Sequence, residues 1–267
     1  MASAAAGEDG RSVSIGRIFS RAFGTIGSNP VATLGIAFLF GALPSLLIAY
    51  VLQTAGMDAF AALGSAAVIA LAIFSAIIAI MLAIITQGAL VRATTAYSEG
   101  RKASLGESAM AGLSVAVPLF VLGLVTAFGI GLGFLLLIVP GIIFYVMWSV
   151  AAPALVEERL GALEAISRSA DLTSGARWKV FGLTLVVVVA YWMFSALVVV
   201  LGAMWYGGMT NFVQNADGGM PIGYFVVNAI AGTITSAVWG VIQTSLYVEL
   251  RDWKDGPRTE ALADIFG

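Results

Sequence analysis

Charged residues leave five long gaps along this chain, and apolar residues dominate each gap. None of the gaps contains Asp, Glu, Lys or Arg; they are Ala22–Met57, Ala59–Val91, Ser108–Val156, Val180–Ala216 and Gly218–Val248. An α-helix of about 20 apolar residues crosses a bilayer core of about 30 Å. Four gaps have room for one crossing, and the third has room for two crossings joined by a tight outer turn at Pro140 and Gly141. The pattern therefore predicts six transmembrane helices.

The same pattern sets approximate limits for the six spans. We expect them at Val31–Leu52, Leu63–Val91, Val115–Leu136, Pro140–Val156, Lys179–Met204 and Ile222–Glu249. Pro44 and Pro153 fall inside spans, where the missing N–H and the ring clash of proline bend a helix. Spans 1 and 4 should therefore be kinked.

Three segments outside the spans predict short helices on the membrane surface. Ile15–Ile26 repeats apolar residues at helical spacing, with Arg17 and Arg21 on its flank. This pattern is typical of a helix that lies in the headgroup layer. A capping box at Ser104–Glu107 begins the second helix, because each of its polar side chains can satisfy an unpaired N–H. The third helix is expected at about Leu163–Leu172.

The fold class is therefore all-α: a polytopic membrane protein with six transmembrane helices and amphipathic interfacial helices. Because each surface helix precedes two spans, the chain divides into three candidate repeats at residues 14–98, 104–157 and 163–250. The alternative is that the surface helices are ordinary amphipathic linkers. Residues 1–12 are small and polar, so we expect a disordered tail followed by a single membrane domain, residues 13–267.

The basic residues determine the expected orientation of the spans. With both termini in the cytoplasm, all Lys and Arg fall on the cytoplasmic side: Arg11, Arg17, Arg21, Arg92, Arg101, Lys102, Arg159, Arg168, Arg177, Lys179, Arg251, Lys254 and Arg258. Only Asp58 and Asp217 remain in the outer loops. Because cytoplasmic loops of membrane proteins are enriched in Lys and Arg, we expect a multi-pass protein with a cytoplasmic N-terminus and C-terminus.

Composition excludes several classes of function. The chain is 60% hydrophobic and only 10% charged, whereas a soluble domain is about 25% charged. It contains no Cys and no His, which removes disulfides, Cys/His metal sites and His-based acid–base catalysis. There is no basic patch suited to nucleic acid, no Ser/His/Asp set and no phosphate-binding loop. We therefore expect no enzyme, no catalytic residue, no metal site and no cofactor.

Polar residues inside the spans are the candidate functional residues, because their burial in lipid is costly. At 100° per residue, the span 6 members fall within about 80° of one another on one helix face. Together with one residue of span 2, the set is Gln87, Asn228, Gly232, Thr235, Trp239 and Gln243. This stripe could bind a lipid headgroup or a partner helix. Alternatively, it forms hydrogen bonds within the bundle, each stabilising it by about 0.6 kcal/mol.

Two further features each have two interpretations. Gly123, Ala127 and Gly131 follow one another at the four-residue spacing that lets helices approach closely, either within the bundle or in a homo-oligomer. Glu157 and Glu158 lie at the inner end of span 4, where they could bind a cation or a proton. They could equally form ion pairs with nearby arginines.

Several strings of residues resemble a known family. They are Pro140–Trp148 (PGIIFYVMW), Pro153–Glu158 (PALVEE), Glu164–Leu172 (EAISRSADL), Gly175–Trp178 (GARW) and Tyr247–Gly256 (YVELRDWKDG). In this order they resemble the bacterial membrane-protein family named for the membrane domain of glycerophosphoryl diester phosphodiesterases. The resemblance implies a six-span helical protein of a bacterial inner membrane. Some members carry a soluble phosphodiesterase domain, to which no residues here correspond, so the resemblance supplies no catalytic residue.

Three hypotheses for the function follow. The first is a non-enzymatic integral membrane protein that acts as a scaffold or accessory subunit for a membrane partner, or that organises lipid. The alternative is a small transporter or lipid-handling permease that uses Gln87 and the span 6 stripe. An intramembrane enzyme is the least favoured, since the spans carry no buried acid. A cavity at mid-membrane lined by Asn228 and Gln87 would favour the transporter over the scaffold.

Overall fold

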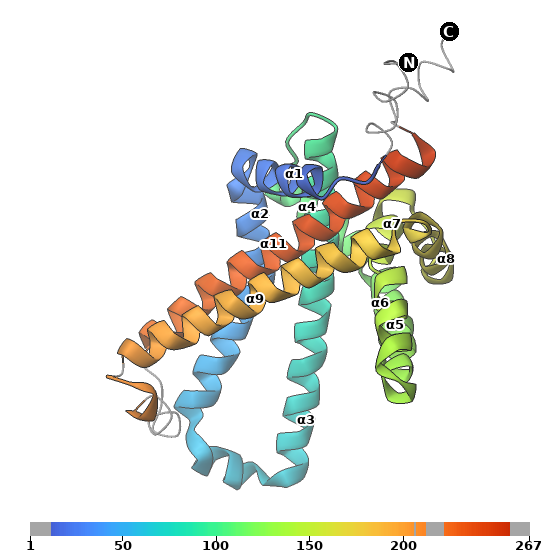
Figure 1. Ribbon diagram of the computed structural model, residues 1–267. Coiled ribbons are helices and arrows are strands. Elements are labelled where there is room, and N and C mark those ends of the chain that lie inside the picture. Colours follow the sequence, from blue (N-terminus) through green and yellow to red (C-terminus); the bar gives the residue numbers. More distant parts are fainter. Residues whose placement is uncertain (1–11, 206, 212–221, 257–267) are drawn as a thin grey trace, which may run out of the picture.

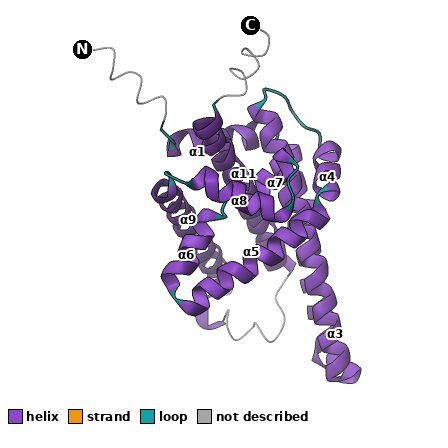
Figure 2. Cartoon of the chain, turned by 90° about the vertical axis from the view of Figure 1, so that its right-hand side faces the viewer, coloured by secondary structure: helices purple, strands orange, loops and turns teal. Residues whose placement is uncertain are grey.

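The computed structural model describes residues 12–205, 207–211 and 222–256. For residues 52 and 55–63 only the backbone is described. All regular elements in these ranges are helices (Figures 1 and 2). Six segments are long and apolar enough to cross a membrane: Pro30–Val51, Gly64–Ser98, Ala116–Leu136, Ile138–Glu158, Arg177–Trp205 and Ile222–Asp255. The all-α architecture with six spans is therefore confirmed. The expected tail, except for Ser12, lies outside the described residues, as does Asp217.

Spans 1 and 2 form a hairpin of three consecutive elements. They are α2 (Pro30–Ile36), the π-helical segment η2 (Ala37–Ala42) and α3 (Leu43–Ser98). The π-helical segment ends two residues before Pro44, where the sequence predicts a bend. α3 continues through the far end of the hairpin, where Gly64 has a φ of 74°, and returns as span 2 (Figure 1). The link that carries Asp58 is therefore helical and not the expected open loop.

Spans 3 and 4 form a second hairpin whose turn differs from the prediction. α5 (Ala116–Leu136) is followed by the single extended residue Leu137, and α6 (Ile138–Met147) starts directly after it. Pro140 lies in the first turn of α6, because the N–H that proline lacks has no partner there in any helix. Gly141 instead lets α5 and α6 approach closely, because a Cβ added to Gly133 of α5 would lie 2.9 Å from the Cα atom of Gly141.

Span 4 is interrupted in the middle. Residues 148–150 are not helical, and the chain resumes as α7 (Ala151–Glu158) with Pro153 in its first turn. This break is the kink predicted at Pro153. Ser169 of α8 (Ala162–Thr173) satisfies part of the freed backbone, since its hydroxyl donates to Met147 O at 2.9 Å and accepts from Val150 N at 3.3 Å.

Three surface helices precede the three pairs of spans, in the predicted order. They are α1 (Ile15–Ser28), α4 (Leu105–Ser114) and α8. Ser104 caps α4 by accepting from Glu107 N at 3.1 Å, but only this half of the predicted capping box is present, because the Glu107 side chain accepts from Arg92 and Arg101 instead. The apolar face of α1 is directed differently from the expectation: Ile18 and Ala22 are each 1% exposed and pack mainly against α11, while Phe23 is 59% exposed. The relation between the three candidate repeats stays a prediction.

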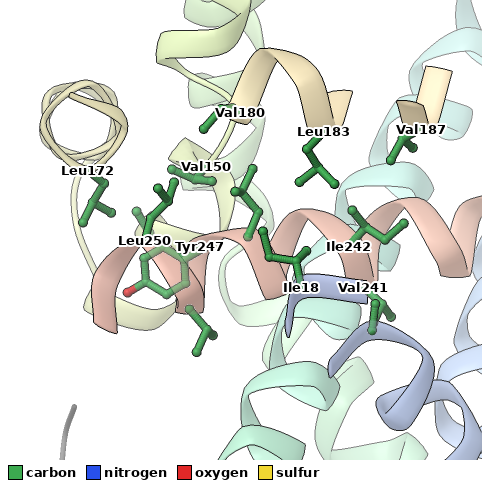
Figure 3. Packing of buried hydrophobic residues seen from close by; sticks show 14 of the residues in the cluster. Ile18, Val150, Leu172, Val180, Leu183, Val187, Val241, Ile242, Tyr247 and Leu250 are labelled. Carbon is green, nitrogen blue, oxygen red and sulfur yellow. The ribbon is translucent and has the colours of Figure 1, made fainter. Parts of the chain in front are cut away.

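The larger of two buried hydrophobic clusters lies where α11 (Ile222–Asp255) meets α1, α3, α7, α8 and the start of α9 (Arg177–Trp205). Figure 3 shows side chains from α1, α8, α9 and the break in span 4 gathered along α11 near Tyr247. From Gly240 to Leu250 every residue of α11 except Gln243 is buried. The core of the molecule is therefore at one end of the bundle, beside the surface helices.

Candidate functional site

The predicted stripe on span 6 runs from the open half of α11 to its packed half. Asn228 and Gly232 are exposed, Thr235 and Trp239 are half-buried, and Gln243 is half-buried among fully buried neighbours. Each side chain therefore has a different environment although all lie on one face. The stripe does not act as a single packing surface.

The packed end of the stripe joins α3, α11 and the break in span 4 through side-chain amides. Gln87 Nε2 donates to Gln243 Oε1 at 2.6 Å, and Gln243 Nε2 donates to Ser149 O at 2.6 Å. Ser149 lies in the break between α6 and α7, so its carbonyl is free of the helical hydrogen-bond ladder. Gly240 makes the approach possible, because a Cβ there would lie 2.6 Å from Leu90 Cδ1 of α3. The two amides thus bond to each other, and Gln243 also donates to a carbonyl that the break in span 4 leaves without a helical partner.

The remaining members of the stripe line a cavity of about 600 Å³ between η2, both legs of α3, α9 and α11. We call it the polar cavity. Five of the six predicted residues line it: Gln87, Asn228, Gly232, Thr235 and Trp239. Hydroxyl groups from three helices add to them, namely Ser45, Thr86, Ser195 and Ser236. The structure therefore brings the predicted residues together around a space and not around a helix–helix contact.

Hydrogen-bonding capacity remains free in the polar cavity. Ser45 and Thr86 donate to carbonyls of their own helix, Gly41 O at 3.0 Å and Leu82 O at 2.8 Å. Asn228 Nδ2 likewise donates to Tyr224 O at 3.0 Å, which leaves its Oδ1 to accept. For the hydroxyls of Thr235 and Ser236, the described part of the chain supplies no hydrogen-bond partner. A ligand in this cavity can therefore both accept and donate hydrogen bonds.

A second cavity, of about 590 Å³, lies between α3, α5, the break in span 4 and α11. We call it the apolar cavity, because most of its lining is aliphatic or aromatic, including Leu119, Phe120, Leu122, Leu124, Ile130 and Trp148. Ala83, Gln87 and Trp239 line both cavities. The two spaces are thus neighbours on either side of a wall made by these three side chains. Gln243, the sixth predicted residue, lines the apolar cavity.

The sequence did not single out Ser45, Ser149, Ser195 or Ser236. A serine in a span usually bonds to a carbonyl one turn back, so its type alone carries little signal. Their only sequence clues are indirect, as Ser45 follows Pro44 and Ser149 precedes Pro153 by one turn.

Charged residues form a separate layer at the packed end. Glu249, only 4% exposed, accepts from Ser14 N at 2.9 Å and Arg17 Nε at 2.8 Å, and it lies 3.7 Å from Arg21. The Glu249 hydrogen bond raises the pKa of Arg17 above its ordinary value. This carboxylate therefore fastens α1 to α11.

The acidic pair at the end of span 4 takes part in the same layer. Glu158 accepts from Arg168 Nε at 2.9 Å and from the Tyr247 hydroxyl at 2.9 Å, and Glu157 accepts from Thr95 at 2.8 Å. Burial acts to lower the pKa of Arg168, but its bonds to Asp255 and Glu158 raise it above the ordinary value. The ion-pair interpretation thus describes Glu158 better than a cation site. Within the described ranges, no group of three or more acidic residues could hold a metal ion.

Comparison with known proteins places the chain in a family. A family model described as domain of unknown function (DUF7847) matches residues 102–250, more than half of the chain. The chain therefore belongs to this family, which is uncharacterised. No curated protein and no solved structure gives a significant match. The resemblance to the glycerophosphoryl diester phosphodiesterase membrane domain stays a prediction, although its motif at residues 140–178 lies inside the matched region.

Proposed function

We propose that this member of the DUF7847 family is a lipid-handling membrane protein that binds an uncharged amphiphile in the polar cavity. The observation that carries the proposal is the cavity itself. It lies between membrane-crossing helices, and hydroxyl and amide groups with free hydrogen-bonding capacity line it. In a protein that only needed packing, these groups would pair across a closed interface, as Gln87 and Gln243 do.

The lining indicates the charge of the ligand. Among the described residues around the polar cavity, none is Asp, Glu, Lys or Arg. A charged group at the centre of a bilayer costs about 2.5–3.5 kcal/mol without a counter-charge. An uncharged hydroxyl- or amide-bearing headgroup avoids that cost and can bond to Asn228, Thr235 and Ser236.

The proposal includes no reaction. The sequence supplies neither His nor Cys, and the described lining of the polar cavity includes no acid or base to transfer a proton. Binding would serve to move the lipid between leaflets or to present it to another protein. The scaffold role, which the sequence favoured, requires no cavity with unpaired polar groups, so we place lipid handling first.

We further propose that the protein resides in a bacterial inner membrane with both termini in the cytoplasm. The support is the distribution of charge. Every Lys and Arg in the described ranges belongs to the surface helices, the segments beside them or the adjoining ends of α3, α9 and α11. These parts gather at one end of the bundle (Figure 1), which is the arrangement that the positive-inside rule favours.

The test measures retained lipid. The protein and the variants N228L, T235V and S236A are purified in mild detergent, and native mass spectrometry counts the bound neutral lipid. We expect the combined T235V/S236A variant to retain at least tenfold less lipid than the unchanged protein. T54V is the matched control, because Thr54 lies on α3 and donates only to its own helix, at 3.0 Å to Tyr50 O.

Two results would overturn lipid handling. One is an unchanged protein that carries no neutral lipid when extracted from its native membrane. The other is equal retention by T235V/S236A and T54V. If N228L instead loses a stoichiometric protein partner, the scaffold role is the correct one.

A further inference from the structure

The two cavities are chemically unequal. The polar cavity offers unpaired hydroxyl and amide groups, whereas most polar atoms in the apolar cavity already have partners. Gln87 and Gln243 bond to each other, Ser149 Oγ donates to Val146 O at 2.8 Å, and Thr126 Oγ1 donates to Leu122 O at 2.8 Å. Beyond these, the described lining of the apolar cavity offers an occupant only the Tyr145 hydroxyl and the indole N–H groups of Trp148 and Trp239, and Trp239 is shared with the polar cavity.

The two cavities are also direct neighbours. Ala83, Gln87 and Trp239 line both spaces, so only the thickness of these side chains separates them. Trp239 is half-buried and has a long apolar edge that a hydrocarbon chain can contact. Each cavity also falls within the range of about 300–1,000 Å³ that is usual for ligand pockets.

We propose that the apolar cavity holds the hydrocarbon chain of the lipid whose polar group occupies the polar cavity, with the ligand lying across Trp239. The ligand class is then a neutral long-chain amphiphile, such as a glycerol monoester. This inference rests on the proposed function, and it adds where the chain goes and which residues limit its length.

Gly123 of α5 is the position at which to test the chain site. It lines the apolar cavity, and a Cβ added to it would meet no atom within 4 Å. G123L therefore adds side-chain volume at the cavity lining, starting from a Cβ position that is free of collision. Gly131 on the same helix also has open space around its Cβ position but is not part of the cavity lining. G131L is thus a control matched in residue type, helix and propensity.

The probe is a set of monoacylglycerols with chains of 8 to 18 carbons and a diazirine at the chain end, in phosphatidylcholine nanodiscs. We expect the long-chain probes to cross-link to residues 119–130 of α5 in the unchanged protein. G123L should reduce that cross-linking at least tenfold for the longest chains and shift the preference to shorter chains, while G131L should leave both unchanged. A127L, whose position also lines the cavity, provides a second variant.

The outcomes separate this inference from the proposed function. If T235V/S236A abolishes lipid retention while G123L and A127L change neither cross-linking nor chain preference, the chain lies elsewhere and this inference is wrong. It is also wrong if cross-links to α5 persist in T235V/S236A, because the two cavities then hold different molecules. Equal retention in all variants would overturn both proposals.

Discussion

The two halves of α11 have opposite surroundings. Between Gly240 and Leu250 all residues except Gln243 are buried, with α1, α3, α7, α8 and α9 as neighbours, and Glu249 is held by two arginines. Between Ile222 and Trp239 only Ala229, Thr233 and Ala237 are buried. One continuous helix thus contributes the core at one end and a cavity wall at the other.

This difference suggests how the protein combines stability with an open interior. Lipid tails are as apolar as leucine, so apolar side chains alone do not pull helices together in a bilayer. The packed end adds ion pairs, capped helix ends and the covering helix α1. The open end lacks such ties in the described residues, and its unfilled volume is available for a ligand. Four predictions test this contrast, from the largest expected effect to the smallest.

Cysteine labelling at the two ends of the bundle should give an all-or-none result. The chain has no cysteine, so D58C and D217C can be labelled individually in intact cells with a membrane-impermeant maleimide. We expect both to react from outside, whereas K102C and K254C react only after the membrane is opened. Labelling of K102C in intact cells would show that the charged end faces outward.

Removing Glu249 should cause the largest loss of stability. E249A leaves Arg17 and Arg21 without their buried carboxylate, and breaking a buried pair costs about 3–5 kcal/mol. We expect a value of about 3 kcal/mol, because Arg17 is half-exposed. SDS titration in mixed micelles measures the free energy of unfolding. D171A is the control, since Asp171 is 63% exposed and such a pair is worth at most about 1 kcal/mol.

Filling a close helix contact at the packed end should cost less. A Cβ on Gly112 of α4 would collide with Ile85 O of α3 and lie 2.9 Å from Ala89 N, so G112A must push the two helices apart. Overpacking of this kind costs about 1–3 kcal/mol. Gly106, on the same helix, has nothing within 4 Å of its Cβ position, and G106A should leave stability unchanged or slightly raised. Equal stability of the two variants would contradict the described α3–α4 contact.

The amide pair between the two cavities should have the smallest effect. Hydrogen bonds between transmembrane helices contribute about 0.6 kcal/mol on average. Q87L and Q243L should therefore each cost about 1 kcal/mol or less, and the double variant should cost less than their sum, because they lose the same bond. Strict additivity in this double-mutant cycle would mean that the two amides do not interact.

Much of the architecture follows from local features of the sequence. Charge-free runs determine the number and approximate limits of the spans, since each must be about 20 residues long to cross a bilayer. Ser104 and Glu107 locate the start of α4 because a capping interaction involves only neighbours in sequence. Helical periodicity likewise places Asn228, Thr235 and Gln243 on one face.

Other features depended on contacts between distant residues. The predicted position of the turn after α5 was wrong by three residues, because Pro140 fits the first turn of a helix as well as it fits a loop. By sequence alone the apolar face of α1 could equally contact lipid. It is buried in the protein because α11 packs against α1 at Ile18. No periodicity predicts that Gln87 meets Gln243 while Asn228 borders a cavity, since helix crossing angles determine which parts of a face touch a neighbour. The sequence by itself determined which residues could be polar and inward-facing; the tertiary structure decided which are paired and which remain open to a ligand, because pairing requires two helices at hydrogen-bonding distance.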